Sequence, residues 1–157
     1  MTTPHISSPM KVLPEWIDYN GHMNMAFYNV LFDRAADEFH ALVGLGPRYA
    51  ETRRHTTYTA EFHIRYLREL HLGQTVRVHS WILGRDEKRL HSWQEIHHED
   101  GWIAATGETL TLHVDMSGPR VVPFPDDIAR ALDRFSEEHG LTELPEGAGR
   151  AIALRRR

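Results

Sequence analysis

The hydrophobic positions of this chain follow a helical period first and a strand period later. Residues 24–43 contain no Pro or Gly, and four of their polar positions recur at spacings of four, four and three. Those positions are Asn29, Asp33, Asp37 and His40. Residues spaced in this way share a narrow stripe of a helix, and the remaining faces are almost entirely apolar. The pattern predicts a mostly buried helix of about 20 residues, with Asn24 as its N-cap and Gly44 or Gly46 at its end.

From residue 57 onwards apolar and polar residues alternate, which is typical of half-buried strands. The predicted strands cover residues 57–66, 75–83, 89–98 and 102–114, a short strand covers about 10–16, and a second helix covers 125–139. Strands joined by short turns form an antiparallel meander. We therefore expect an α+β fold in which a curled antiparallel sheet wraps around one long buried helix, with a C-terminal helix added.

The length of the chain, 157 residues, is typical of one domain. We expect that domain to span residues 1–140, with a loose start over 1–9, and we expect residues 141–157 to form a flexible tail.

Composition excludes several kinds of site and partner. The chain has no Cys, so it can form no disulfide, thiolate zinc site, iron–sulfur cluster or cysteine nucleophile. A net charge of −4 gives no reason to expect binding to nucleic acid. No uninterrupted apolar run exceeds four residues, whereas a membrane span needs about 20. We expect a cytoplasmic protein without a membrane segment.

Twelve histidines leave metal binding open at first. They are spread over the predicted strands, however, and no closely spaced pair has an obvious third ligand. We therefore predict no metal site.

The segment from Asp18 to Asn24 joins the first strand to the long helix. A carboxylate at this point lies beside the first N–H groups of a helix, which lack intrahelical partners and carry partial positive charge. Gly21 allows a tight turn and close approach of a substrate. Asp18 with the amides near Met23 to Met25 would place a base or nucleophile beside an oxyanion site, as acyl transfer requires. The alternative is that Asp18, Asn20 and Asn24 are only turn and capping residues.

Two segments carry a resemblance to a known family: Asp18-Tyr19-Asn20-Gly21-His22-Met23-Asn24 followed by Phe27-Tyr28, and the later Phe62-His63-Ile64-Arg65-Tyr66-Leu67-Arg68. They resemble the hotdog-fold acyl-CoA thioesterases of the 4-hydroxybenzoyl-CoA thioesterase type over roughly residues 10–125. The resemblance implies a hotdog fold and an acyl-CoA substrate. It also implies that Asp18 attacks the thioester or activates water, that the backbone amides at the start of the helix polarise the carbonyl, and that no cofactor is needed. The active site would lie across the interface of a homodimer or homotetramer.

Three further runs are similar to the thioesterases of carnitine degradation, which hydrolyse betainyl-CoA: residues 64–69, 83–91 and 112–115. The acyl group would then carry a trimethylammonium, which aromatic faces bind by cation–π attraction. The candidates for this contact are Trp16, Tyr19, Phe27, Tyr28 and Trp93. The alternative for each of them, and the commoner case, is ordinary packing in the core or at a dimer interface. Arg85, Lys88 and Arg89, in the turn after Leu83, are candidates for binding the phosphates of coenzyme A.

His22 lies four residues after Asp18, and Gly21 is between them. Hotdog enoyl-CoA hydratases have their His five residues after the Asp, with a Pro between, so the spacing here favours a loop-shaping role for Asn20, His22 and Asn24. Two alternatives to a thioesterase stay open at this point: an enoyl-CoA hydratase and a non-catalytic acyl-CoA-binding protein.

Overall fold

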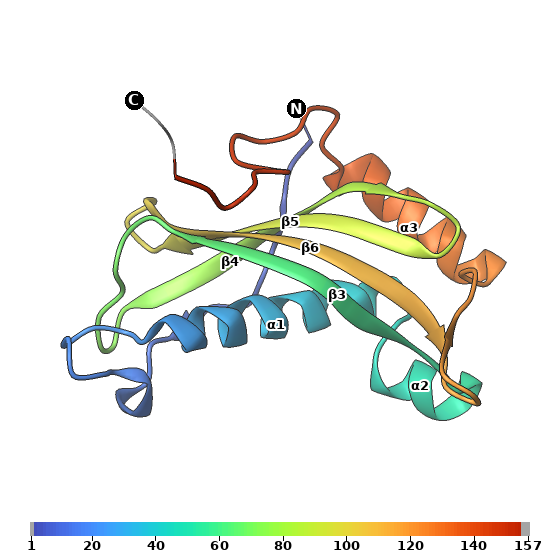
Figure 1. The fold of residues 1–157 in the computed structure, drawn as a ribbon, viewed down its shortest axis with the longest axis horizontal. Helices are drawn as coiled ribbons and strands as arrows, with labels where there is room; N and C mark the ends of the chain where they lie inside the picture. The colour runs from blue at the N-terminus through green and yellow to red at the C-terminus, as the bar shows by residue number, and fades with distance from the viewer. Residues whose placement is uncertain (1, 155–157) are drawn as a thin grey trace.

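The computed structural model describes residues 2–154 and shows one long helix lying along a curled sheet (Figure 1). The helices are α1 (Met25–Leu42), α2 (Pro47–Arg53) and α3 (Asp126–His139), with a 3₁₀ turn η1 (Pro14–Trp16). The long strands are β3 (His55–Tyr66), β4 (Thr75–Arg85), β5 (Arg89–His98) and β6 (Ile103–Asp115). Three strands of two residues complete the sheet: β1 (His5–Ile6), β2 (Met10–Lys11) and β7 (Arg120–Val121).

The strands are ordered β1-β4-β5-β6-β3, with β2 also on β4 and β7 on β6, and all of these pairs are antiparallel. The predicted α+β arrangement, a curled antiparallel sheet around one long helix, is confirmed. The register of β5 places Gln94 toward α1, because its side-chain amide donates to the Phe32 carbonyl. Alternate residues such as Trp93 therefore project from the outer face of the sheet.

The core consists of two clusters arranged along α1. Leu31, Phe32 and Ala35 pack with Val76 and Ile96 around the N-terminal half of the helix. In the second cluster, around the C-terminal half, Phe39 and Val43 pack with Ile82, Leu90 and Leu132 of the sheet and α3. α2 and α3 lie at this far end of the molecule and are joined by a bidentate pair between Arg53 and Asp127 (Figure 1).

The N-terminal region differs from its prediction. The expected strand over residues 10–16 is only two residues long, because Pro14 has no N–H to donate to a ladder and η1 begins there. Residues 2–9 are also less irregular than predicted, since β1 pairs with β4 and the Ser7 side chain accepts a hydrogen bond from the Val78 amide; residue 1, the first of the predicted loose start, lies outside the described residues.

Helix α2 was not predicted. Its seven residues are fixed by Pro47 in the first turn and by Tyr49, which is buried and hydrogen-bonded to His113 at 2.8 Å. This contact depends on residues 64 positions apart, so local pattern does not indicate it.

Strand β3 is an edge of the sheet, with no neighbouring strand on its outer side among the described residues. The polar stripe of α1 faces a groove between the helix and this edge, so the helix is not enclosed on all sides. Residues 141–154 continue past α3 without regular structure, and the Leu141 amide donates to the Ile82 carbonyl. The flexible tail and the single domain over residues 1–140 stay predictions. Within residues 2–154, no helix combines the length and apolarity needed to cross a bilayer.

Candidate active site

The loop between η1 and α1 is a closed turn built around Asp18. The Asp18 amide donates to the His22 carbonyl at 3.2 Å, and the Gly21 amide donates to the Asp18 carbonyl at 3.0 Å. Gly21 has φ 81°, a conformation that costs other residues energy. The turn therefore holds Asp18 directly in front of the first turn of α1.

Two hydrogen bonds orient the Asp18 carboxylate. The Asn20 amide donates to Oδ1 at 2.8 Å, and the Asn24 side-chain amide donates to Oδ2 at 3.0 Å. The bond from Asn20, opposed by partial desolvation and supported by the bond from Asn24, lowers the pKa of Asp18 below its usual value. The group is therefore an anion at neutral pH, ready to act as a nucleophile or base.

Asn24 connects this carboxylate to the helix. Its Oδ1 accepts a hydrogen bond from the Ala26 amide at 3.0 Å, which makes it the N-cap of α1, as predicted. The Met23 amide donates to the Leu70 carbonyl and the Asn24 amide to the Trp16 carbonyl, so neither is free to bind an oxyanion. The Met25 amide has no acceptor within residues 2–154, which narrows the predicted oxyanion site to this one N–H group.

His22 points toward the loop after β3. Its Nε2 lies 3.3 Å from Glu69 Oε2, and its ring meets His71 edge-on at 6.2 Å between centroids. These contacts tie the Asp18 turn to residues 69–71. They fit the loop-shaping role predicted for His22.

The aromatic candidates for an acyl-binding site are not gathered in one place. Trp16 is buried and stacks on Phe27 at 5.5 Å, with the Arg34 guanidinium over its ring. Tyr28 is buried, and its hydroxyl accepts a hydrogen bond from the Leu70 amide. Tyr19, next to Asp18, is 97% exposed.

Trp93 is the aromatic candidate that the structure separates from the site. It projects from the outer face of β5 and its indole N–H donates to Glu95 at 3.1 Å. The sheet lies between Trp93 and α1, so it does not belong to the acyl-binding site of its own chain.

The predicted phosphate-binding cations also lie away from Asp18. Arg85, Lys88 and Arg89 are at the β4–β5 turn, beside α3 and at the opposite end of the sheet from the start of α1 (Figure 1). Arg85 forms a bidentate pair with Asp133 at 2.7 Å, and Arg89 is paired with Asp86. Two of the three cations are thus engaged in structural ion pairs, and all three are far from the Asp18 carboxylate of the same chain.

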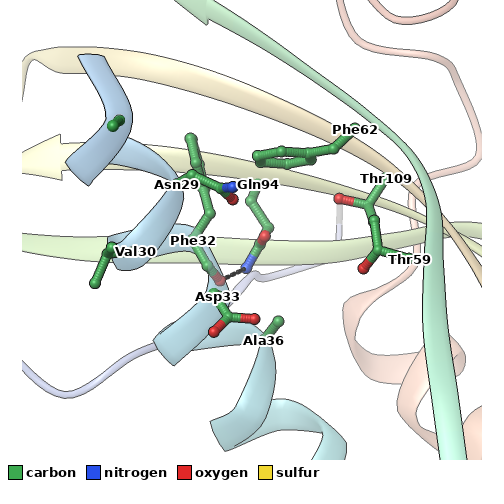
Figure 2. A pocket seen from close by; sticks show the side chains of 10 residues that line it. Asn29, Val30, Phe32, Asp33, Ala36, Thr59, Phe62, Gln94 and Thr109 are labelled. Carbon is green, nitrogen blue, oxygen red and sulfur yellow. Dashed lines mark hydrogen bonds between the residues drawn. The ribbon is translucent and has the colours of Figure 1, made fainter.

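A cavity of about 280 Å³ lies between α1 and the inner face of the sheet (Figure 2). Asn29 and Asp33 line its helix side, and the hydroxyls of Thr59 and Thr109 face them from β3 and β6. Gln94 closes the cavity from β5, held by the Phe32 carbonyl and the Ser80 hydroxyl. The polar stripe of the helix is a sequence signal for this site, but the sequence does not show that the stripe faces a cavity.

A second cavity of about 130 Å³ continues the first along α1. Asp33 lines both, and Asp37 and His40 line the second. Burial and the nearby Asp33 carboxylate raise the pKa of Asp37, and burial lowers the pKa of His40 to about 4. The wall of the groove provided by α1 is therefore acidic, and His40 is uncharged at neutral pH.

Tyr66 is a residue of the site that sequence reasoning did not single out. Its hydroxyl donates to the Met25 carbonyl at 3.1 Å, and its ring meets Tyr28 edge-on at 5.0 Å. The end of β3 is thereby fixed against the start of α1. Within residues 2–154, no three His, Asp or Glu side chains are grouped as metal ligands.

Known proteins share both sequence and fold with this chain. The profile of the thioesterase-like superfamily matches residues 12–132. The chain is 39% identical over 148 residues to the betainyl-CoA thioesterase of Pseudomonas aeruginosa, covering 91% of both chains. It is 38% identical to an L-carnitine dehydrogenase/betainyl-CoA thioesterase of Rhizobium meliloti, of which it spans 29%.

Solved structures show the same fold over nearly the whole chain. A Staphylococcus aureus protein, determined in complex with CoA, superposes with a TM-score of 0.91 and 30% identity, covering 99% of this chain and 98% of its own. A putative thioesterase from Pseudomonas putida superposes with a TM-score of 0.83 and 33% identity, covering 98% of each chain. The predicted hotdog arrangement is confirmed.

Proposed function

Because the chain belongs to the thioesterase-like superfamily and is an acyl-CoA thioesterase, we propose that its substrate is betainyl-CoA and that Asp18 performs the chemistry. The observation that carries the mechanism is the Asp18 carboxylate, oriented by Asn20 and Asn24 immediately before α1. The observation that carries the substrate is the similarity to the Pseudomonas aeruginosa enzyme over 91% of both chains.

The reaction follows from these positions. The thioester oxygen accepts the Met25 N–H, which withdraws charge from the carbonyl carbon. Asp18 either attacks that carbon, expelling the CoA thiolate and leaving a mixed anhydride that water hydrolyses, or removes a proton from an attacking water. On either route the products are the carboxylate of the acyl group, CoA thiol and one proton. No cofactor takes part in either route.

A betainyl group suits this carboxylate. Its quaternary nitrogen lies one carbon from the carbonyl and withdraws electrons, so a carboxylate of lowered basicity is nucleophilic enough to react. The acidic wall of the cavity, Asp33 and Asp37, begins about 12 Å along α1 from Met25, so it would attract a cationic acyl group at a distance without contacting it. Tyr19, exposed beside Asp18, is the aromatic side chain free to contact the trimethylammonium.

The complete site would need a second copy of the chain. The groove between α1 and β3 opens at an edge strand of twelve residues whose central positions are exposed. Pairing of two such edges would cover the groove and bring a second set of polar side chains to it. We therefore propose a homodimer or a dimer of dimers. With no cysteine to oxidise, it would act in the cytoplasm.

The test is release of free thiol from a panel of CoA esters: betainyl, its uncharged isostere 3,3-dimethylbutyryl, an aromatic ester and short straight-chain esters. We expect the highest kcat/KM for betainyl-CoA. Preference for another ester would reject betainyl-CoA as the substrate but not the thioesterase activity. Loss of the absorbance of an enoyl-CoA without release of thiol would instead indicate a hydratase. Binding of acyl-CoA without turnover would indicate a non-catalytic acyl-CoA-binding protein.

Asp18→Asn tests the mechanism. The amide has the size of the carboxylate but is neither a nucleophile nor a base, so we expect a loss of kcat of at least about 1000-fold. Its single acceptor oxygen can serve only one of the two donors, so we also expect a fall in melting temperature of about 2–4 °C, with the fold retained. Near-normal turnover would overturn the role of Asp18. Single-turnover hydrolysis in ¹⁸O-water distinguishes the two routes, because the label enters the Asp18 carboxylate only if Asp18 attacks the thioester covalently.

A further inference from the structure

The turn that carries Asp18 is the tip of a short hairpin, and Trp16 lies at the base of that hairpin. The Asn24 amide donates to the Trp16 carbonyl at 2.9 Å, and Ile17 and Met23 form an antiparallel bridge one position farther along. Asp18 follows directly, and its carboxylate accepts a hydrogen bond from the Asn24 side chain. The backbone at Trp16 therefore fixes how Asp18 lies relative to Asn24 and the start of α1.

The Trp16 ring packs along one side of α1. It stacks on the Phe27 ring at 5.5 Å between centroids, with 13° between the two planes. The Arg34 guanidinium lies over the Trp16 ring at 5.4 Å from its centroid. Phe27 and Arg34 are two helical turns apart on the same side of α1. A single side chain thus contacts the helix over two turns, which holds η1 and the hairpin against α1.

These contacts leave the Trp16 ring unsuited to bind a cationic acyl group. Trp16 is only 5% exposed, and a guanidinium already lies over its ring. Within residues 2–154, Arg34 forms no ion pair that would neutralise its charge. A trimethylammonium beside Trp16 would therefore meet a like charge at short range. Trp16 and Phe27, both candidates for the acyl-binding site, fit a packing role instead.

We propose that Trp16 is a positioning residue for hydrolysis: its ring, held on α1 by Phe27 and Arg34, keeps Asn24 within hydrogen-bonding distance of the Asp18 carboxylate. Trp16 acts through Asn24 and touches no reacting atom. Loss of the ring contact would let the hairpin move relative to α1, weaken the bond from Asn24 and orient the carboxylate less well. The inference rests on the proposed function in that Asp18 performs the chemistry, and it holds for any acyl group.

Two substitutions weaken the ring contact in different ways. Trp16→Phe keeps an aromatic ring of smaller area, and Arg34→Met keeps an unbranched stem but removes the charge over the ring. We expect kcat to fall about 10-fold in Trp16→Phe and about 3-fold in Arg34→Met, with KM nearly unchanged. The loss should be equal for betainyl-CoA and 3,3-dimethylbutyryl-CoA, because the contact does not involve the acyl group. Arg34→Lys should keep most of the activity, since a cation remains over the ring.

The ionisation of Asp18 gives a readout that a purely structural role would not move. The hydrogen bonds from Asn20 and Asn24 lower the pKa of Asp18. A weaker bond from Asn24 should therefore move the acid limb of kcat/KM to higher pH in both Trp16→Phe and Arg34→Met. Titration of the Asp18 carboxyl followed by ¹³C NMR should show the same displacement without any turnover.

Arg53→Met is the matched control. The Arg53 guanidinium also lies over an aromatic ring, that of Tyr49, at 5.4 Å from its centroid, but on α2 at the far end of the fold (Figure 1). This substitution also removes the ion pair with Asp127. We expect a lower melting temperature, unchanged kinetics and an unchanged acid limb.

Three results would overturn the proposal. A raised KM for betainyl-CoA alone in Trp16→Phe would show that Trp16 contacts the acyl group. An unchanged kcat and acid limb, with or without a lower melting temperature, would show that Trp16 only stabilises the fold. An equal loss of kcat in Arg53→Met would show that turnover merely follows stability. Failure of the proposed function is distinguishable, because near-normal turnover in Asp18→Asn would reject the role of Asp18 whatever the Trp16 and Arg34 variants do.

Discussion

Asn24 performs two tasks with two atoms, and substitutions at this position separate them. Its side-chain oxygen caps α1 through the Ala26 amide, and its side-chain nitrogen donates to the Asp18 carboxylate, both at 3.0 Å. Asn24→Ala removes both bonds. Asn24→Ser keeps a capping oxygen and removes the donor, and Asn24→Asp keeps the cap while placing a second carboxylate against Asp18.

The stability effect follows from the cap alone. Loss of an Asn N-cap costs about 1 kcal/mol, which corresponds to a fall in melting temperature of about 2–4 °C for a chain of this size. We expect this fall for Asn24→Ala and little change for Asn24→Ser. Asn24→Asp keeps the cap, but the repulsion between its carboxylate and that of Asp18 lowers its stability at neutral pH. The positive end of the helix dipole favours an Asp here and partly offsets this repulsion.

The activity effect follows from the donor. The bonds from Asn20 and Asn24 lower the pKa of Asp18, so in the wild type the acid limb of kcat/KM lies below the usual range of a carboxyl group. Loss of the Asn24 donor raises that pKa and moves the limb to higher pH. The Ser and Ala variants should shift by the same amount, because the Asn20 bond remains in both. The Asp variant should shift most, since two adjacent carboxylates resist ionising together.

The measurements are thermal unfolding at neutral pH and pH profiles of kcat/KM for all four proteins. The reasoning requires that the order of stability differ from the order of activity: Asn24→Ala melts below Asn24→Ser although the two shift equally in pH profile, and Asn24→Asp shifts most in pH profile. Coincidence of the two orders would show that Asn24 acts only through folding. An unmoved acid limb in Asn24→Asp would show that the limb does not report Asp18.

Two further predictions concern the groove along α1. Asp33→Asn should lower kcat/KM for betainyl-CoA about 5- to 10-fold relative to 3,3-dimethylbutyryl-CoA. Only the betainyl group carries a positive charge that Asp33 can attract across a partly solvated cavity. Equal effects on the two esters would show that Asp33 does not take part in recognition of the acyl group. Burial lowers the pKa of His40 to about 4, so the unfolded chain binds more protons below its ordinary pKa of 6.5. Stability should therefore be full above about pH 6.5 and fall by up to about 1.4 kcal/mol per pH unit as the pH drops toward 4. Denaturant titrations of wild type and His40→Gln should converge in acid, and an identical pH dependence would contradict this role.

The parts of the fold that the sequence predicts are those fixed by local periodicity. Helix α1 begins after Asn24 as expected, and β5 spans residues 89–98 as expected. The same periodicity cannot say which side of a strand faces α1. On β5 the inward positions include the polar Ser92 and Gln94, while the apolar Trp93 points outward, so the usual association of apolar residues with the inner face would have placed Trp93 in the wrong layer.

The candidate site divides in the same way. Asp18 and its loop can be predicted from the sequence, because the capping residue, the glycine turn and the start of the helix are adjacent in it. The sequence does not show that the amides of Met23 and Asn24 are already hydrogen-bonded, because the acceptor of the Met23 amide is Leu70, far along the chain. The sequence also does not predict that Arg85 lies far from the site. Its position depends on the length of β4, and its partner Asp133 lies on α3.

The bulge in β3 restricts how the open edge of the sheet is used. The register of β3 against β6 shifts between Thr59 and Glu61, so the edge is locally twisted in its middle. An extended edge without such a defect would accept almost any extended chain during synthesis or heating, and would seed aggregation. In the homodimer that we propose, a second copy related by a twofold axis would bring a backbone with the same distortion to this edge. The irregularity would thus favour pairing with an identical chain over pairing with an unrelated extended segment.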